Sequence, residues 1–278
     1  WSVGWNETNA KEDGTIEWRT EVPSSWDEVI LQGPHFTVAT PLARQPNEGC
    51  KHRQDYADWN LERLPDQVVP RTNYQRACDR PTYDERIDQW WGRPSSSYWR
   101  HVHREMPHPG LARPLHGAIL QPGPVLASQI SMRLALGDRA TAILSGLLAS
   151  VPYDYIVKVS GATHLKDYLV RRLPVPLDHP LDSELLLRTL RLNCLIAEYA
   201  PLWNALFDSA WQLDAWAGSG THSVRLSDVG PEWSIATPLR TDFDRRLALV
   251  ELDALAAVML GLTAEQLCAM YRTQFAVL

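Results

Sequence analysis

The sequence predicts an α+β fold, in which a small mixed β-sheet forms the first part of the chain and helices form a C-terminal subdomain. Residues 128–134 alternate apolar and polar side chains, which is the pattern of a half-buried strand. Residues 183–199 and 242–261 instead place apolar side chains at three- and four-residue intervals, which is typical of helices with one buried face. We therefore expect two domains, at residues 1–176 and 177–278.

Short elements and long loops are expected in the first hundred residues. Two runs, at residues 29–32 and 36–40, are rich in β-forming side chains and are each followed closely by a proline. Residues 1–28 are polar and acidic, which indicates irregular structure or a short hairpin. Prolines interrupt residues 43–82 four times and predict a loop-rich excursion there.

A short basic helix is expected after this excursion. The three serines at residues 95–97 offer a cap for a helix through residues 98–104. Arg100 and Arg104 would then lie four residues apart on one face of that helix. Residues 114–120 follow as a further strand. The helical face is a candidate contact for a negatively charged partner.

The rest of the chain is organised around its central stretch, residues 142–176. This stretch begins as an apolar helix that Pro152 interrupts. It then crosses a polar elbow at residues 160–164, and Pro174 and Pro176 end it. The elbow joins an apolar helix to a basic segment.

Capping residues mark the helices of the last hundred residues. Asp182 or its neighbour can begin the first of them, and Pro201 begins a second over residues 202–216. Thr263 followed three residues later by Gln266 is a capping box that predicts the last helix.

The charge distribution favours an anionic partner at the centre of the chain. The net charge of −6 argues against indiscriminate nucleic-acid binding. Residues 100–176, however, carry 9 basic and 4 acidic side chains, a net charge of +5, whereas residues 1–43 carry −5 and residues 177–278 carry −6. An anion would be steered to the middle block. Chance clustering of solvated arginine and lysine is the alternative.

The chain shows no catalytic residues, no metal ligands and no cofactor fingerprint of its own. A P-loop, a Gly-x-Gly-x-x-Gly turn and a Gly-x-Ser-x-Gly elbow are all missing. The four cysteines are scattered without a paired spacing, which indicates reduced thiols in a cytoplasmic protein. No run of about 18 apolar residues predicts a membrane span.

Polar and basic side chains suited to DNA contact are concentrated around the centre. Arginine and asparagine pair with guanine and adenine edges, while lysine, threonine and backbone N–H groups contact phosphates. Arg172 also lines the elbow. Packing of arginine on tryptophan inside the domain is the alternative for each arginine. The candidate DNA-binding residues are Arg71, Asn73, Arg76, Arg100, Arg104, Lys158, Thr163, His164, Lys166 and Arg171.

The central stretch contains YDYI at residues 153–156, SGATHL at residues 160–165 and LPVP at residues 173–176. This order resembles the C-terminal region of large DNA adenine-N6 methyltransferases, including type IIG restriction–modification enzymes and methylases of phage-defence systems. There a similar pattern closes the target-recognition domain. Further similar segments are VGWNETN at residues 3–9, ILQGPHF at 30–36, PRTNY at 70–74, YWR at 98–100, and the RR, ELDA and GL pieces within residues 245–262.

The resemblance implies that the chain reads double-stranded DNA for an adenine methyltransferase. The Asn-Pro-Pro-Tyr type catalytic loop and the S-adenosylmethionine site of that family are missing here, so this part holds no cofactor. We expect a fragment whose catalytic domain, with S-adenosylmethionine, lies upstream of Trp1 in the same polypeptide. Ala162 replaces the second glycine of the family's elbow.

Two other classes of function stay open. One is a protein-interaction module that docks a partner subunit of a defence complex, which the tryptophan-rich first hundred residues and the acidic helical tail favour. The other is an independent hydrolase, for which no catalytic constellation is visible.

Overall fold

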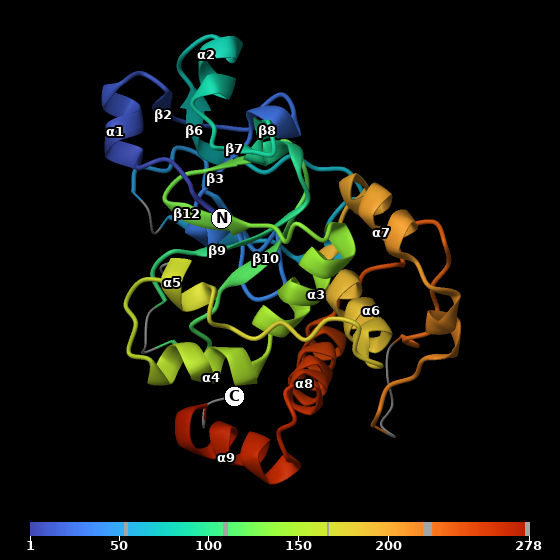
Figure 1. Cartoon of the computed structure of the whole chain (residues 1–278). Coiled ribbons are helices and arrows are strands. Elements are labelled where there is room, and N and C mark those ends of the chain that lie inside the picture. Colours follow the sequence, from blue (N-terminus) through green and yellow to red (C-terminus); the bar gives the residue numbers. More distant parts are fainter. Residues whose placement is uncertain (53–54, 108–110, 166, 219–223, 276–278) are drawn as a thin grey trace.

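The computed structural model confirms the α+β class: strands gather in one half of the molecule and most of the longer helices in the other (Figure 1). The strands form several small sheets. The structure describes residues 1–52, 55–107, 111–165, 167–218 and 224–275.

The largest sheet in the described part of the chain has four antiparallel strands. Their order is β1 (Ser2–Val3), β12 (Gln129–Met132), β9 (Arg100–Arg104) and β10 (Gly117–Leu120). Strand β9 is hydrogen-bonded on both edges and is packed against α3 (Asp138–Leu148), so nearly all of its side chains are buried.

The remaining strands form two-stranded pairs. One pair is parallel and the others are antiparallel, so the strands as a whole are of mixed type. The pairs are β3 (Ile30–Leu31) with β11 (Val125–Leu126) in parallel, β2 (Ile16–Glu21) with β6 (Thr72–Arg76), β4 (Arg44–Pro46) with β5 (Tyr56–Asp58), and β7 (Gln89–Trp90) with β8 (Arg93–Pro94).

The helices begin largely where capping residues predict. The Thr263 hydroxyl accepts a hydrogen bond from the Gln266 backbone N–H at 3.2 Å. The side-chain oxygen of Gln266 accepts one from the Thr263 backbone N–H at 2.8 Å, which confirms the capping box. Besides α3, the helices are α1 (Glu7–Glu12), α2 (Arg80–Glu85), α4 (Val151–Val159), α5 (Asp167–Val170), α6 (Asp182–Asn193), α7 (Ala200–Leu206), α8 (Asp242–Met259) and α9 (Ala264–Gln274).

The main hydrophobic core is continuous across residue 176. Leu147 of α3, Leu185 of α6 and Leu252 of α8 are fully buried in one cluster. A side chain at Gly146 would collide with the Thr189 hydroxyl, so glycine allows α3 and α6 to approach closely. The division into domains at residue 176 stays a prediction, while the packing joins the two parts.

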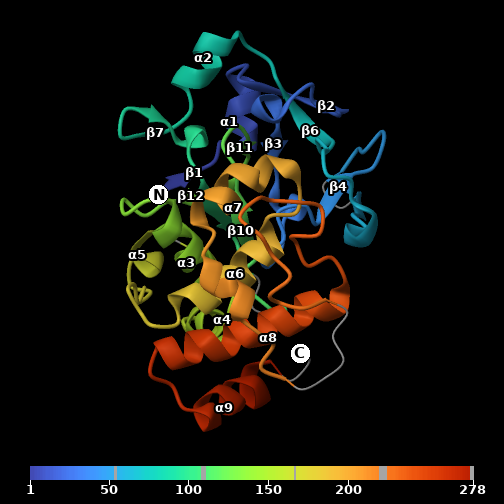
Figure 2. The same cartoon turned by 90° about the vertical axis from the view of Figure 1, so that its right-hand side faces the viewer.

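Helix α8 crosses one end of the molecule, with α9 beneath it (Figure 2). No single helix among the described residues is both long and apolar enough to span a bilayer. Helices α3 and α4 together pass that test by length and composition, but they meet at a bend of 67° and supply much of the buried core.

The predicted helix over residues 98–104 is wrong. Only Ser95–Ser97 form a single helical turn, and the chain then continues as the central strand β9. Arg100 and Arg104 therefore do not share an exposed helical face. Residues 100–104 instead pair with β10 on one side and β12 on the other. This pairing outweighs the local capping signal, and it could not be seen in the local sequence because β10 and β12 are distant along the chain.

Further local predictions also differ from the structure. The run at residues 36–40 is not a strand: it makes a single bridge between Thr37 and Thr40, and Ala39 takes a left-handed φ of 48°. The first 28 residues contain helix α1 as well as strands, because the Asn6 side chain accepts hydrogen bonds from two backbone N–H groups of the first turn. In addition, the helices expected over residues 183–199 and 202–216 end early, at Asn193 and Leu206.

Candidate nucleic-acid interface

The elbow at residues 160–164 is a tight turn at the C-terminus of α4. Gly161 takes a left-handed φ of +66°, the conformation in which helices commonly end at glycine. The Ser160 hydroxyl donates to the Val157 carbonyl at 2.7 Å and accepts from the Ala162 N–H at 3.2 Å. Ala162 itself is not left-handed, so alanine fits where the similar family has a second glycine.

The two ends of the elbow segment are anchored to the body of the protein. The Tyr153 hydroxyl donates a hydrogen bond to the Pro174 carbonyl oxygen and so joins the YDYI and LPVP segments. The buried Leu165 donates its N–H to the Glu105 carbonyl oxygen at 2.9 Å. The turn between these anchors projects from a fixed base.

The elbow and α5 border an open cleft of ≈ 540 Å³. Thr163 and His164 line it, with the hydroxyl and the imidazole Nδ1 3.2 Å apart. Tyr168, which is 62% exposed, and Arg172 line it as well. The cleft thus combines a hydroxyl, an imidazole, an aromatic ring and a guanidinium group.

Arg171 extends this basic surface beside the cleft. Its side chain is 72% exposed and pairs with Asp167 at 2.6 Å, one helical turn away. An ion pair this exposed is weak, so a phosphate could replace the carboxylate. Lys166, another candidate, lies outside the described residues. Among the candidates, Thr163 and His164 therefore line the cleft, and Arg171 is exposed next to Arg172, which also lines it.

Lys158 points away from the elbow cleft. Its Nζ donates to the Gln274 carbonyl oxygen at 2.8 Å and lies 4.7 Å from the centre of the Phe275 ring. These contacts attach the end of α9 to α4. Lys158 thus has a packing role in this structure.

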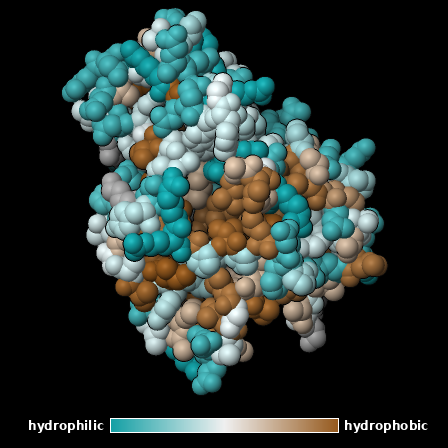
Figure 3. Space-filling view, in the orientation of Figure 1, coloured by the Kyte–Doolittle hydropathy of each residue, from teal (hydrophilic) through white to brown (hydrophobic). Residues whose placement is uncertain are grey.

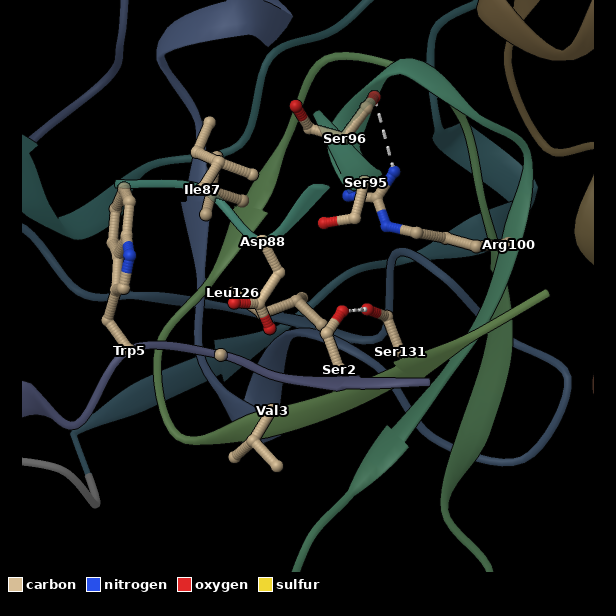
Figure 4. A pocket seen from close by; sticks show the side chains of 12 residues that line it. Ser2, Val3, Trp5, Ile87, Asp88, Ser95, Ser96, Arg100, Leu126 and Ser131 are labelled. Carbon is tan, nitrogen blue, oxygen red and sulfur yellow. Dashed lines mark hydrogen bonds between the residues drawn. The ribbon is translucent and has the colours of Figure 1, made fainter. Parts of the chain in front are cut away.

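Arg100 is buried inside the fold. Its guanidinium donates to backbone carbonyls of Ser96, Tyr98, Gln121 and Pro124. Figure 4 shows it directed toward the serines that border a small pocket of ≈ 30 Å³, a volume suited to about one water molecule. Burial lowers the pKa of the guanidinium to about 10. Arg100 holds loops together and does not reach an external ligand.

The candidates on and beside β6 serve the interior as well. Arg71 donates to a backbone carbonyl at 3.0 Å, and Asn73 is fully buried in a side-chain hydrogen-bond network. Arg76 pairs with Glu28 at 3.0 Å and stacks near a tyrosine ring. The structure does not bring these three residues to the elbow cleft.

Arg104 lies at the edge of a second cleft. Its Nε donates to the Gly33 carbonyl oxygen at 2.8 Å and its Nη2 to the Phe36 carbonyl oxygen at 2.9 Å. Partial burial lowers the pKa of its guanidinium to about 10. The residue is fixed in place but still borders open space.

The YDYI and ELDA segments each contribute a carboxylate to one buried charge network. Asp154 is fully buried and accepts hydrogen bonds from the Arg113 guanidinium and from the Leu115 N–H. Asp253 of α8 accepts from the first N–H of α4, at Val151, at 2.6 Å. Burial raises the pKa of Asp154 to about 6, against the opposing effect of Arg113. These motif carboxylates join α4 and α8.

The net charge of the central block overstates its exposed charge. Arg100 and Arg113 are buried, and Arg133 pairs with Asp138 while its guanidinium lies 5.1 Å from the Tyr98 ring. Among the described residues of this block, the exposed cations are Arg171 and Arg172, which follow α5, and Arg139 of α3, which pairs with Asp182 at 3.3 Å. Arg133 therefore packs on an aromatic ring inside the protein, although this ring is a tyrosine and not a tryptophan as the alternative expects.

Sequence reasoning missed Tyr168 as a member of the candidate interface. Its position between a polar elbow and two arginines was visible in the sequence, and an exposed aromatic ring in such a setting is typical of base stacking. Within the described ranges, no group of three or more His, Cys, Asp and Glu side chains is placed to hold a metal ion.

Comparison with protein-family models gives no match for this chain, and comparisons with curated proteins and with solved structures give none either. The resemblance to adenine methyltransferases rests on the sequence segments alone. Function is therefore argued from those segments together with the geometry of the elbow.

Proposed function

We propose that this chain is the DNA sequence-recognition part of an adenine-N6-specific DNA methyltransferase of a restriction–modification or phage-defence system. The observation that carries the proposal is the anchored elbow, where Thr163, His164, Tyr168 and Arg172 line one open cleft and the exposed Arg171 is the neighbour of Arg172 in the chain. Three of the segments that resemble such methyltransferases, YDYI, SGATHL and LPVP, lie in this elbow and in the hydrogen bond that anchors it.

In this proposal the elbow approaches double-stranded DNA in the cytoplasm. Arg171 and Arg172 contact phosphates, and Thr163 donates to a further phosphate. Tyr168 presents an exposed ring on which a base can stack. An upstream methyltransferase domain of the same polypeptide binds S-adenosylmethionine and receives the flipped target adenine.

The arginines inside the fold support this arrangement indirectly. Arg100 and Arg113 fix the strands and helices on which the elbow is mounted. A reader mounted on rigid elements holds its contact groups at constant spacing, which favours sequence discrimination.

The elbow proposal predicts a specific change in salt dependence. Replacing Arg171 and Arg172 together with alanine should weaken duplex binding similarly for all sequences, because phosphate contacts carry no sequence information. Loss of two phosphate contacts should make the slope of log K against log salt less steep by about 2. Fluorescence anisotropy with a labelled duplex at several salt concentrations measures both quantities.

Arg44 provides the matched control. Like Arg171 it is an exposed arginine that pairs with an aspartate, Asp58 at 2.5 Å, but it lies on β4. Arg44→Ala should leave the slope unchanged. An equal change in the two variants, or no binding of duplex DNA by the unaltered protein, would contradict the proposal.

A second candidate function, docking of a defence-complex subunit, is favoured by the outer face of α8. Phe243, Val250 and Val258 are 58%, 55% and 55% exposed and are spaced seven and eight residues apart, so they share one face of the helix. Apolar side chains also gather in the middle of the face shown in Figure 3. An amphipathic segment of a partner is suited to such a stripe.

Glutamate at Phe243 and Val250 tests this candidate. The double variant should lose co-purification with the partner subunit while its binding to duplex DNA stays unchanged, since the stripe lies on α8 and the elbow follows α4. Substitution of the exposed Leu213, which lies outside the stripe and is 89% exposed, is the control. Retained co-purification in the double variant would rule out the stripe as the docking surface.

A further inference from the structure

A second open cleft, of ≈ 420 Å³, lies beside the four-stranded sheet. Its volume falls within the range of small-molecule sites. Four separate parts of the chain line it: the start of α1, the turn at Gly33–His35, strand β5, and the adjoining ends of β9 and β12. Polar side chains from each of these parts face one space.

One wall of this cleft is fixed by a network of hydrogen bonds. The Gln32 amide donates to a Glu7 carboxylate oxygen at 3.1 Å. The side-chain oxygen of Gln32 accepts hydrogen bonds from the Tyr56 hydroxyl at 2.8 Å and from the side-chain amide of Asn73 at 3.2 Å. Glu7, Gln32 and Asn73 are buried, so the wall is rigid before any ligand arrives.

The facing wall presents an acceptor beside a cation. Gln129 and Arg104 are directly opposite each other in the antiparallel pair β12–β9, which places neighbouring side chains on one face of the sheet. The Gln129 amide nitrogen donates to the Ala127 carbonyl oxygen at 3.2 Å. Its buried carbonyl oxygen has no hydrogen-bond partner within the described part of the chain.

Gly33 lies close against these two side chains. A Cβ at this position would lie 3.2 Å from the Gln129 carbonyl oxygen and 3.3 Å from Arg104 Cγ, which is tighter than ordinary contact. The hydrogen bonds of Arg104 to Gly33 and Phe36 use Nε and Nη2. Arg104 Nη1 is therefore oriented by the rest of its guanidinium, and it donates no hydrogen bond within the described residues.

The lining excludes some ligands and favours others. Two carboxylates, of Glu7 and Glu105, border the cleft and repel a phosphate. An acceptor from Gln129 next to a donor from Arg104 complements an edge that carries an amino group next to a ring nitrogen. Adenine and cytosine have such an edge on their Watson–Crick side, whereas hypoxanthine and uracil present a carbonyl next to a ring N–H.

We propose that this cleft binds a single nucleobase through its amino-bearing edge, with the amino group donating to Gln129 and the ring nitrogen accepting from Arg104. The inference rests on the proposed function for the origin of the base, which is DNA held at the elbow. Glu105 lines the cleft and its carbonyl accepts from Leu165, so the cleft and the base of the elbow are adjacent. Such a base is turned out of the duplex, as in enzymes that read an extruded nucleotide.

Free nucleosides test the cleft without requiring DNA binding. Saturation-transfer NMR with the full chain should show 2′-deoxyadenosine and 2′-deoxycytidine bound at millimolar concentration. The matched nucleosides 2′-deoxyinosine and 2′-deoxyuridine differ only in the recognised edge and should give little or no transfer. Equal transfer from both members of each pair, or no transfer from any of the four, would overturn the proposal.

Variants assign the binding to Gln129. Gln129→Met keeps the length of the side chain but removes the acceptor, so transfer from 2′-deoxyadenosine should be lost. Gln75→Met is the control, because Gln75 is also a half-buried strand glutamine but lies on β6 and outside the cleft. Should Gln129→Met not fold by circular dichroism, Gly33→Ala, which crowds the Gln129 oxygen, should lower the transfer instead. Unchanged transfer in the folded variant would refute the role of this pair.

The two proposals fail in different ways. If no nucleoside shows transfer but duplex binding depends on Arg171 and Arg172, the nucleobase site is refuted and the recognition function stands. If nucleoside transfer depends on Gln129 but the protein binds no duplex, the nucleobase site stands and the recognition function is refuted.

Discussion

Replacement of Asp154 by alanine is expected to lower the free energy of unfolding by about 3–5 kcal/mol, because it leaves the buried Arg113 guanidinium without its counter-charge. Arg113 is 12% exposed and Asp154 is fully buried. Asp253 lies 3.9 Å from Arg113 and already accepts from the Val151 N–H and the Tyr271 hydroxyl, so it compensates only in part. The Leu115 N–H also loses its acceptor.

Urea denaturation at neutral pH measures this change, and Asp58→Ala is the matched control. Asp58 also accepts from an arginine, Arg44, but its side chain is 72% exposed, so its loss should cost at most about 1 kcal/mol. Similar losses for the two variants would show that the Asp154 pair is not the buried anchor described here.

Local signals allowed much of the helical part to be predicted from the sequence. The capping box at Thr263 and the strand over Gln129–Met132 depend on residues close together in the chain, and the structure has both. The elbow is a similar case, since Gly161 alone supplies the left-handed residue that ends α4. Short-range capping motifs and apolar periodicity can be recognised in the sequence without knowledge of the tertiary fold.

The candidate site was harder to predict because the fate of an arginine depends on distant parts of the chain. Arg100 is buried by carbonyl oxygens of Gln121 and Pro124, more than twenty positions away, whereas Arg171 remains exposed. Nothing in the local sequence distinguishes these two arginines. Charge counting along the chain therefore placed interior and surface cations in the same block.

Many tryptophans show the same limit of sequence reasoning. The tryptophan-rich first hundred residues suggested an interaction surface, which stays a prediction, whereas tryptophans later in the chain close the irregular segment between α7 and α8. Trp203 is buried and donates its indole N–H to the Gly230 carbonyl oxygen at 2.9 Å, and Trp233 donates to the Cys194 carbonyl oxygen at 2.8 Å. Each ring supplies apolar area together with one hydrogen bond for a loop carbonyl.

Replacement of Arg188 by methionine is expected to destabilise the helical layer by a similar amount, about 3–5 kcal/mol, because two carboxylates lose one shared cation. The Arg188 Nε lies 2.6 Å from Glu251 of α8, and its Nη1 lies 2.6 Å from Asp214. Arg188 and Glu251 are almost fully buried. Methionine retains most of the apolar stem, so the loss reports on charge more than on packing.

Arg139→Met is the control for this measurement, since Arg139 also joins two helices, through Asp182 of α6 at 3.3 Å, but is 50% exposed. It should cost at most about 1 kcal/mol in the same urea titration. Further replacement of Glu251 and Asp214 by methionine and leucine should restore much of the stability lost in Arg188→Met, because a buried ion network can be exchanged for apolar packing as a unit. Continued loss with each added substitution would instead mean that the carboxylates stabilise the fold through their backbone contacts, such as the 2.6 Å hydrogen bond from the Ala217 N–H to Glu251. The ELDA segment would then be required for loop attachment independently of Arg188.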